Sequence, residues 1–241
     1  MAHAGKVKKS SRLDHTPARP VRVRQYKHLV LIVCEDERTE KLYFETAFPN
    51  LPENTVYVRP VGTGRDPLGV AQWAVAARKK LQDEFRRDVD QVWLVFDKDD
   101  ADLDPGKTAR FEKAVDLAKQ EEMRLAFSNE VFELWLLLHF EDVTGPLPRE
   151  TVYQMLDTAL RAHPLFTTAG YHHKKTSQHK QSKPEDVLQA VREKGDEALA
   201  HARAEALLSA HGNRSLLSTN PSTRVHLLLQ SLRGWIAFHS V

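Results

Sequence analysis

The chain has 241 residues, of which 41% are hydrophobic and 28% charged, and its formal net charge is only +2. This composition supports a folded domain with a hydrophobic core and excludes a wholly disordered chain. The single cysteine excludes a disulfide framework and a multi-cysteine zinc site, and it suits a reducing compartment. No apolar run approaches the roughly 18–20 residues of a membrane-spanning helix, so we expect a soluble cytoplasmic protein without membrane contact.

Charge is segregated along the chain. Residues 1–28 contain eight Lys or Arg and one Asp, for a net charge of +7. Residues 29–148 contain fifteen basic and twenty-four acidic residues, for −9, and residues 149–241 contain twelve and eight, for +4. An acidic centre between basic ends suits a cation-dependent site beside a surface that binds a polyanion. A solvated tail followed by ordinary acidic helix faces produces the same totals, so charge alone does not define a site.

The first half of the chain alternates between short apolar runs and amphipathic segments. Residues 1–25 lack apolar periodicity and are predicted to form a flexible basic arm. Residues 28–34 form a continuous β-branched run, which indicates a strand buried on both faces of a parallel sheet. We expect a helix over residues 35–48, a second strand over 55–61, and a long amphipathic helix over 68–87.

The alternation continues as far as residue 140. Residues 91–96 are predicted to form a third buried strand, followed by a helix over 109–122 and a short strand over 124–127. Ser128 and Asn129 are then expected to cap a markedly apolar helix over residues 130–140. This order predicts an α/β fold, a three-layer sandwich with a mainly parallel central sheet.

The character of the sequence changes near residue 145. We therefore expect an α/β catalytic domain over residues 26–145 and a helical C-terminal extension over residues 146–241. In the extension, helices are predicted over residues 149–161, 184–208 and 221–239, the last with Asn220 as N-cap and Pro221 at its first position.

Three carboxylates stand out by their position after predicted strands. Glu35 follows the first strand, and Asp97 and Asp99 follow the third. In parallel sheets, ligands bind at the carboxyl ends of the strands, so these acids meet if the two strands are neighbours. Crowded carboxylates repel one another, and a hard divalent cation such as Mg²⁺ or Mn²⁺ relieves that repulsion. A polar loop rich in turn residues is the alternative, and phospho-receiver or haloacid-dehalogenase patterns fit this chain less well.

Three further residues are catalytic candidates. Glu133 is the one acid inside the apolar run, where a buried carboxylate needs a partner, a proton or a metal, so it is either a further ligand or a base. A structural salt bridge from Glu133 to Arg124 or Lys98 is the alternative. His139 follows the same argument, although a lone histidine at a helix end is more often structural. Lys98 either stabilises developing phosphate charge or is a surface lysine.

Two segments are candidates for binding nucleic acid. Arg65 follows the Gly62–Gly64 turn, which offers backbone N–H groups to a phosphate or simply makes the turn. The basic loop over residues 171–183 is suited to gripping a phosphate backbone, although a solvated insertion is equally consistent with it. Its candidate contacts are His172, His173, Lys174, Lys175 and Lys180.

Four stretches, in order, resemble one protein family. They read VCEDERTEKLYF from residue 33, VWLVFDKDD from 92, FSNEVFELWLLLHF from 127 and NPSTRVHLLL from 220. An acid after the first strand and D-x-D after the third are similar to the Toprim fold of topoisomerases, primases and OLD-family nucleases. Together the four stretches resemble the RloB-like (Abi-type) family of Toprim proteins over residues 28–240.

The resemblance implies a Mg²⁺-dependent, nuclease-like effector, often paired with an ATPase in phage-defence loci. It places the metal ligands on Glu35, Asp97 and Asp99. Asp36 departs from the family pattern, because Toprim proteins usually have Gly after the glutamate.

We therefore expect a Toprim-type nuclease that hydrolyses nucleic-acid phosphodiesters with Mg²⁺ or Mn²⁺, with an ATPase partner and a possible homo-oligomer. The main alternative is a non-catalytic module that binds nucleic acid or a partner through a Toprim scaffold. Hydrolysis of small phosphoesters is a third possibility.

Overall fold

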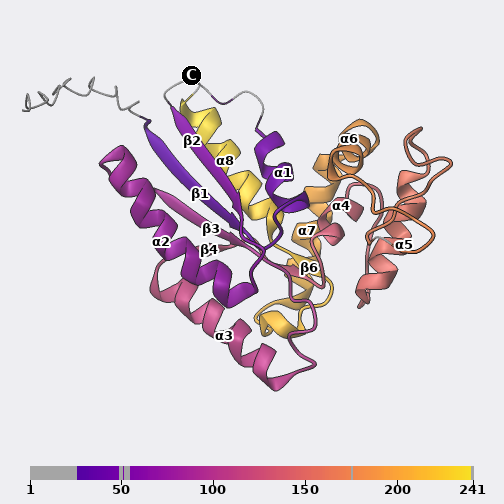
Figure 1. The fold of residues 1–241 in the computed structure, drawn as a ribbon, viewed down its shortest axis with the longest axis horizontal. Coiled ribbons are helices and arrows are strands. Elements are labelled where there is room, and N and C mark those ends of the chain that lie inside the picture. Colours follow the sequence, from indigo (N-terminus) through magenta and orange to yellow (C-terminus); the bar gives the residue numbers. More distant parts are fainter. Residues whose placement is uncertain (1–25, 49–50, 52–54, 175, 240–241) are drawn as a thin grey trace, which may run out of the picture.

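Four parallel strands form the central sheet of the computed structural model, which describes residues 26–48, 51, 55–174 and 176–239 (Figure 1). In spatial order the strands are β2 (Val56–Gly62), β1 (His28–Cys34), β3 (Gln91–Val95) and β4 (Arg124–Leu125). β1 and β3 are therefore direct neighbours, with Cys34 in register with Val95 at their ends. The predicted basic arm over residues 1–25 lies outside the described residues.

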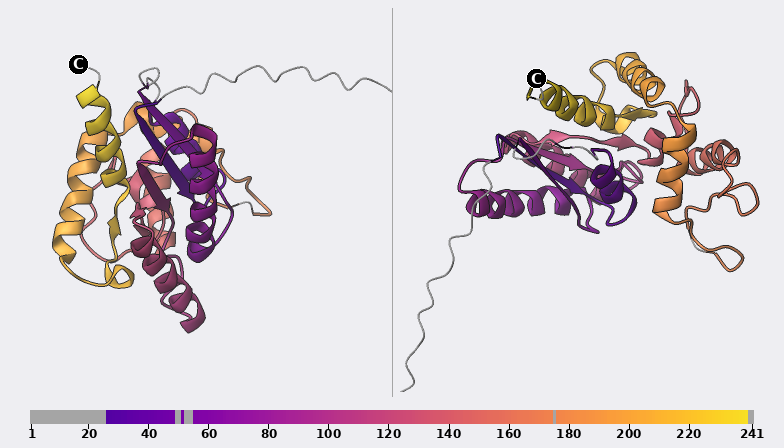
Figure 2. Two further views of the ribbon diagram at one scale, coloured as in Figure 1. Left: turned by 90° about the vertical axis from the view of Figure 1, so that its left-hand side faces the viewer. Right: turned by 90° about the horizontal axis from the view of Figure 1, so that it is seen from above.

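The central strand β1 is fully buried because helices cover both faces of the sheet. Leu31 and Val33 pack into one core with α2 (Pro67–Phe85) and α3 (Pro105–Gln120). Val30 and Ile32 point to the opposite face and join a second core. Figure 2 shows α2 and the C-terminal helix α8 (Val225–His239) on opposite sides of the sheet. The predicted three-layer sandwich with a parallel sheet is confirmed.

The second core contains residues from both halves of the chain. It gathers side chains of the sheet with those of α1 (Thr39–Thr46), α4 (Glu133–Leu137), α5 (Arg149–Leu160), α6 (Pro184–Lys194), α7 (Glu197–His211) and α8. α8 lies directly against the sheet, where Ser231 Oγ donates a hydrogen bond to Gln91 Oε1 at 3.0 Å and Trp235 stacks on His28. The change of pattern near residue 145 thus separates two kinds of secondary structure that share one core.

Two predicted helix boundaries are wrong because a small second sheet forms. Residues 130–140 do not form one helix: β5 (Ser128–Asn129) comes first, and α4 has only five residues. β5 pairs antiparallel with β6 (Ser222–Thr223), so α8 begins at Val225 rather than at Pro221. Asn220 caps no helix, because its Oδ1 accepts from Leu147 N at 2.9 Å and its Nδ2 donates to Glu130 Oε1 at 2.9 Å.

The helix predicted over residues 184–208 is two helices, α6 and α7. Asp196 starts α7 by accepting a hydrogen bond from Leu199 N at 2.9 Å. At Gly195, an added Cβ would lie 2.7 Å from the Cβ of His139, so the chain passes too close to His139 for a side chain. Close packing and a strong cap therefore end one helix and begin the next.

Candidate active site

The carboxyl ends of β1 and β3 bring Glu35 and Asp97 together. Glu35 N donates a hydrogen bond to Val95 O at 2.9 Å, which extends the ladder one residue beyond β1. The Glu35 side chain then turns toward the neighbouring strand, where its Oε2 accepts from Asp97 N at 3.1 Å. Adjacent parallel strands thus place these two acids at one edge of the sheet.

The turn after β2 supports Glu35 from the other side. Gly64 N donates to Glu35 O at 2.9 Å, and Thr63 N donates to Cys34 O at 3.1 Å. An added Cβ on Gly62 would lie 2.4 Å from Glu37 Cα, so only glycine permits this approach of the two loops. The Gly62–Gly64 turn is therefore part of the backbone frame of the site.

A cavity of about 630 Å³ opens at this edge of the sheet. It is lined by acidic side chains from the strand ends, α1 and α4, and by basic or aromatic side chains that include those of α5 and the 171–183 loop. The lining acids include Glu35, Glu40, Asp97, Asp99 and Glu133, and the lining bases include Arg38, Arg65, Arg149, His173 and Lys174. Its volume suits a small ligand or one or two nucleotides of a longer chain.

Asp97 is the most constrained acid of the site. Its Oδ1 is buried and has no hydrogen-bond partner among the described residues. Burial raises the pKa of Asp97 well above its ordinary value, and the negative charges of Glu40, Glu35 and Glu133 raise it further. An acceptor oxygen held in this way is costly unless a proton or a cation is present.

Glu35 and Glu40 share this environment. Burial raises the pKa of Glu35 to about 8, and Asp99, Asp66 and Asp36 add to the effect against the opposing hydrogen bond from Asp97 N. Burial also raises the pKa of Glu40, whose residue is 2% exposed and whose Oε2 accepts from Asp36 N at 3.0 Å. Three carboxyl groups are therefore held together with little compensating positive charge.

Asp36 adds negative charge beside Glu35 and Glu40, but its carboxylate is already hydrogen-bonded. Its own carboxylate accepts a hydrogen bond from Thr39 N, at the start of α1, while its N–H bonds Glu40. The side chain that replaces the usual Toprim glycine is thus occupied in shaping the first turn of the helix.

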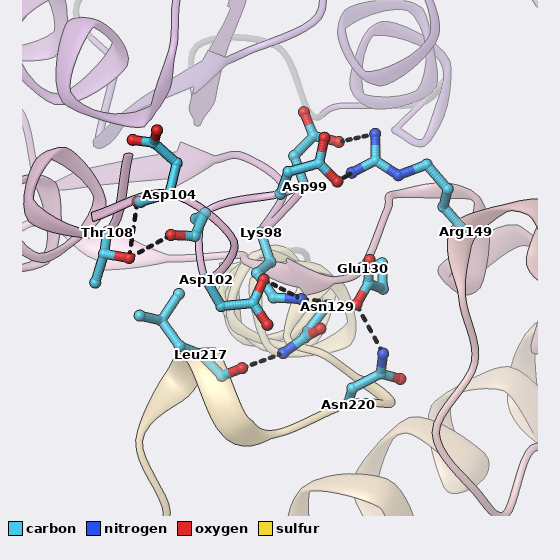
Figure 3. Close-up of polar contacts among 12 residues, drawn as sticks. Lys98, Asp99, Asp102, Asp104, Thr108, Asn129, Glu130, Arg149, Leu217 and Asn220 are labelled. Atoms are coloured by element: carbon cyan, nitrogen blue, oxygen red, sulfur yellow. Dashed lines mark hydrogen bonds and ion pairs between the residues drawn. The ribbon is translucent and has the colours of Figure 1, made fainter. Parts of the chain in front are cut away.

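Asp99 is held by a cation from the second half of the chain. Arg149 Nη1 lies 3.0 Å from Asp99 Oδ1, and Arg149 Nη2 lies 2.9 Å from Asp100 Oδ1 (Figure 3). Burial lowers the pKa of Arg149, but Asp99 and Asp100 outweigh it and the net shift is upward. Asp99 lines the same cavity as Asp97, with its carboxylate already paired.

Lys98 points away from this cavity and into the protein. Its side chain is 4% exposed, and its Nζ lies 2.7 Å from Glu130 Oε1 and 2.9 Å from Asp102 Oδ1 (Figure 3). Asn220 donates to the same Glu130 oxygen, so the group ties the β3 loop to the C-terminal segment. Lys98 does not line the cavity, and its ammonium group is engaged in these two ion pairs.

Glu133 is buried and paired with His173. His173 Nδ1 lies 3.1 Å from Glu133 Oε1, and Tyr171 Oη donates to the same oxygen at 3.4 Å. The His173 ring stacks on Tyr153, with centroids 3.9 Å apart and planes 11° from parallel. Neither Arg124 nor Lys98, the partners expected for Glu133, forms an ion pair with it.

The remaining predicted residues divide into two groups. Arg65, His172 and Lys174 line the cavity with His173, while Lys180 is exposed on the same loop and outside the lining. Lys175 lies outside the described residues. His139 lines a different, smaller cavity, where its Nδ1 bonds Trp135 O at 2.9 Å and burial lowers its pKa.

Sequence reasoning missed Glu40 and Arg149. Glu40 shares the buried face of α1 with Tyr43 and Phe44. Its helical spacing from these apolar residues could have predicted that it is a buried acid. Arg149 is the first residue of α5, where the helix dipole disfavours a cation, and that misfit pointed to an external partner.

The donor set fits a hard divalent cation. The unpartnered Asp97 Oδ1, beside Glu35, is the kind of oxygen ligand that Mg²⁺ and Mn²⁺ take. Across the described part of the chain, no three His, Cys, Asp or Glu side chains gather into a ready-made metal site. Mg²⁺ commonly takes only one or two protein carboxylates and completes its coordination with several waters. Glu35 and Asp97 can supply those two carboxylates.

The parallel sheet, its flanking helices and the acids after β1 and β3 define a Toprim-like α/β protein. A family model described as RloB-like protein matches residues 30–232, so the chain belongs to the RloB-like family. Comparisons with curated proteins and with solved structures find no match. No helix of the described residues combines the length and apolar character needed to cross a membrane.

We expect Lys98→Met to destabilise the protein, because it leaves Glu130 without its cation. Removing one partner of a buried ion pair costs about 3–5 kcal/mol, and the partial exposure of Asp102 places this case near the lower end. Urea unfolding measures the change, with the exposed Lys107→Met as control. Equal stability of the two variants would contradict a packing role for Lys98.

Without divalent ions, we expect the free energy of unfolding to fall as the pH rises from about 5 to 8. The pKa of Glu35 is about 8 in the folded protein and 4.5 ordinarily, so in this window the folded state keeps a proton that the unfolded state has lost. Glu35→Gln should reduce the slope, and the exposed Glu112→Gln should not. Urea unfolding in EDTA at several pH values measures this pH dependence. The same slope in wild type and Glu35→Gln would contradict a raised pKa of Glu35.

Proposed function

We propose that this protein is a divalent-cation-dependent nuclease that hydrolyses nucleic-acid phosphodiesters. The observation that carries the proposal is the buried, unpartnered Asp97 Oδ1 beside Glu35, since both acids line a cavity that is also lined by basic side chains. A divalent cation would relieve the repulsion between the acids, and a bound phosphate would contact both that cation and the basic side chains of the lining. Phosphodiester chemistry uses this combination of charges.

Glu35 and Asp97 are the proposed holders of Mg²⁺ or Mn²⁺, with Asp99 as the third member of the set. The ion would polarise the phosphate and lower the pKa of a water nucleophile. Arg149 pairs with Asp100 and fixes the orientation of Asp99 at the cavity wall. Arg65 and Lys174, both exposed and on the lining, are suited to hold the phosphates on either side of the scissile bond.

His173 is suited to move a proton in this reaction. Its Nδ1 faces Glu133, which leaves Nε2 as the ring nitrogen available to substrate or water. Glu133, Tyr171 and the stacked Tyr153 hold the ring, so its orientation is set before substrate arrives. Glu133 then acts through His173 rather than as a metal ligand.

The wider biological role remains part of the proposal. Resemblance to the RloB-like family supports a cytoplasmic phage-defence effector that works with an ATPase partner. Lys180, exposed on the 171–183 loop, extends the basic surface beyond the cavity, and this surface is suited to a nucleic-acid chain.

A non-catalytic nucleic-acid-binding subunit is the second candidate. The observation in its favour is the ion pair between Arg149 and Asp99, which occupies one of the three predicted ligands with a protein cation. A binding subunit needs the basic side chains of the cavity lining but no metal.

We expect wild-type protein to cleave at least one of ssDNA, dsDNA, total RNA and tRNA with Mg²⁺ or Mn²⁺, and none in EDTA. Asp97→Asn and Glu35→Gln should each lower the rate by at least about 100-fold, since metal stabilisation of the transition state contributes several kcal/mol. The exposed Asp116→Asn should cleave like wild type. Binding of the same substrates without cleavage, unaffected by Asp97→Asn, would favour the binding subunit.

We expect His173→Gln to lower kcat by about 10²- to 10⁴-fold, the usual contribution of a positioned acid or base. The loss should shrink as the pH rises, because hydroxide replaces a base. His179→Gln, in the exposed part of the same loop, is the matched control. Single-turnover rates over a pH series measure the effect, and a change confined to KM would assign His173 to substrate binding instead.

A further inference from the structure

A second cavity, of about 880 Å³, lies between α3, β4 and the C-terminal segment 212–217, which includes the short helix η1 (Leu216–Ser218). It shares no lining residue with the candidate active site. We call it the arginine cavity, because Arg124, Arg214 and Arg224 all line it.

Arg224 is the central observation. Its Nε is buried without a hydrogen-bond partner, and no carboxylate of the described residues pairs with its side chain. Burial lowers the pKa of Arg224, and no acid opposes this shift. By contrast, Arg59 and Arg149 are paired with carboxylates that raise their pKa. A half-buried guanidinium without a counterion is unfavourable, and it is the arrangement expected of a site that awaits an anion.

Two more arginines add to this positive charge. Arg124 lies over the Trp93 ring, 5.5 Å from its centroid, and donates to Ser231 Oγ at 3.1 Å. Arg214 is exposed, and like Arg124 it has no carboxylate partner in the described part of the chain. Guanidinium groups bind phosphate through paired N–H donors.

The other lining charges leave an excess of positive charge. Lys119 lies 3.8 Å from Asp116, so these two side chains largely cancel. Glu112 is the remaining acid of the lining, against three arginines. The net charge therefore favours an anionic ligand.

Most of the remaining lining is apolar, with Asn213 and Ser215 as its uncharged polar side chains. Leu216 and Leu217 of η1 face the cavity together with Met123 and Leu125. A volume of this size is within the range of small-molecule sites, and an apolar wall with a few polar groups is their usual composition. Inorganic phosphate alone would leave the apolar part unused.

We propose that the arginine cavity binds a phosphate-bearing small molecule of about nucleotide size, with Arg224 and Arg124 on the phosphate and the leucines of η1 on the organic part. The site is separate from the proposed nuclease centre and does not depend on it.

Calorimetric titration in EDTA tests this proposal with four probes: pyrophosphate, AMP, ATP and a short oligo-dT. We expect the wild type to bind AMP or ATP, and Arg224→Gln to weaken that binding about 10- to 100-fold, as loss of a charge-assisted contact does. Arg110→Gln, whose arginine pairs with Asp66 outside the cavity, should bind normally. Asp97→Asn should also bind normally, which separates this result from failure of the nuclease proposal.

A stability measurement tests whether Arg224 has only a structural role. Without ligand, Arg224→Met should unfold at the same or a higher temperature than wild type, because no counterion is left behind. A clearly lower unfolding temperature would overturn the proposal. So would the absence of AMP and ATP binding to wild type, equal affinity in Arg224→Gln, or Arg224-dependent binding of oligo-dT alone, which would make the cavity part of a nucleic-acid surface.

Discussion

The cost of burying uncompensated carboxylates is the constraint around which this structure is arranged. β1 and β3 are buried on both faces, so the residues that follow them emerge at one fixed edge of the sheet. That edge places Asp97 against Glu35, with Glu40 close enough to raise the pKa of Asp97. Such a group of buried acids needs a proton or a cation to offset its charge, and the function we propose assigns that role to a divalent cation.

The second half of the chain supplies the basic partners of acids in the candidate active site. The β5–β6 ladder and the contacts of Glu130 with Lys98 and Asn220 fasten the C-terminal segment to the loop after β3. From that attachment, α5 delivers Arg149 to Asp99, and the following loop delivers His173 to Glu133. The acidic half and the basic half of the chain thus meet in one cavity, which gives structural meaning to the charge segregation in the sequence.

The predictable part of the fold is the part that local pattern determines. Continuous apolar runs predicted β1 and β3, and the rule for carboxyl ends of parallel strands predicted that Glu35 and Asp97 meet. The partners of these acids could not be predicted, since Arg149 lies more than a hundred residues from Glu35 and its approach depends on tertiary packing. The apolar run over 130–140 suggested a long helix, but Ser128 and Asn129, its expected caps, pair with β6 instead. Lys98 looked like a catalytic cation because local sequence does not reveal that Glu130 turns back to meet it.

Divalent-cation binding in the absence of nucleic acid tests the central claim most directly. Mn²⁺ titration followed by electron paramagnetic resonance compares wild type with Asp97→Asn and with the surface control Asp116→Asn. If Glu35 and Asp97 hold the cation, wild type and the control bind Mn²⁺, and Asp97→Asn, which lacks one charged ligand oxygen, binds it at least about tenfold more weakly. Equal Mn²⁺ binding by all three proteins, or none by wild type, would contradict it.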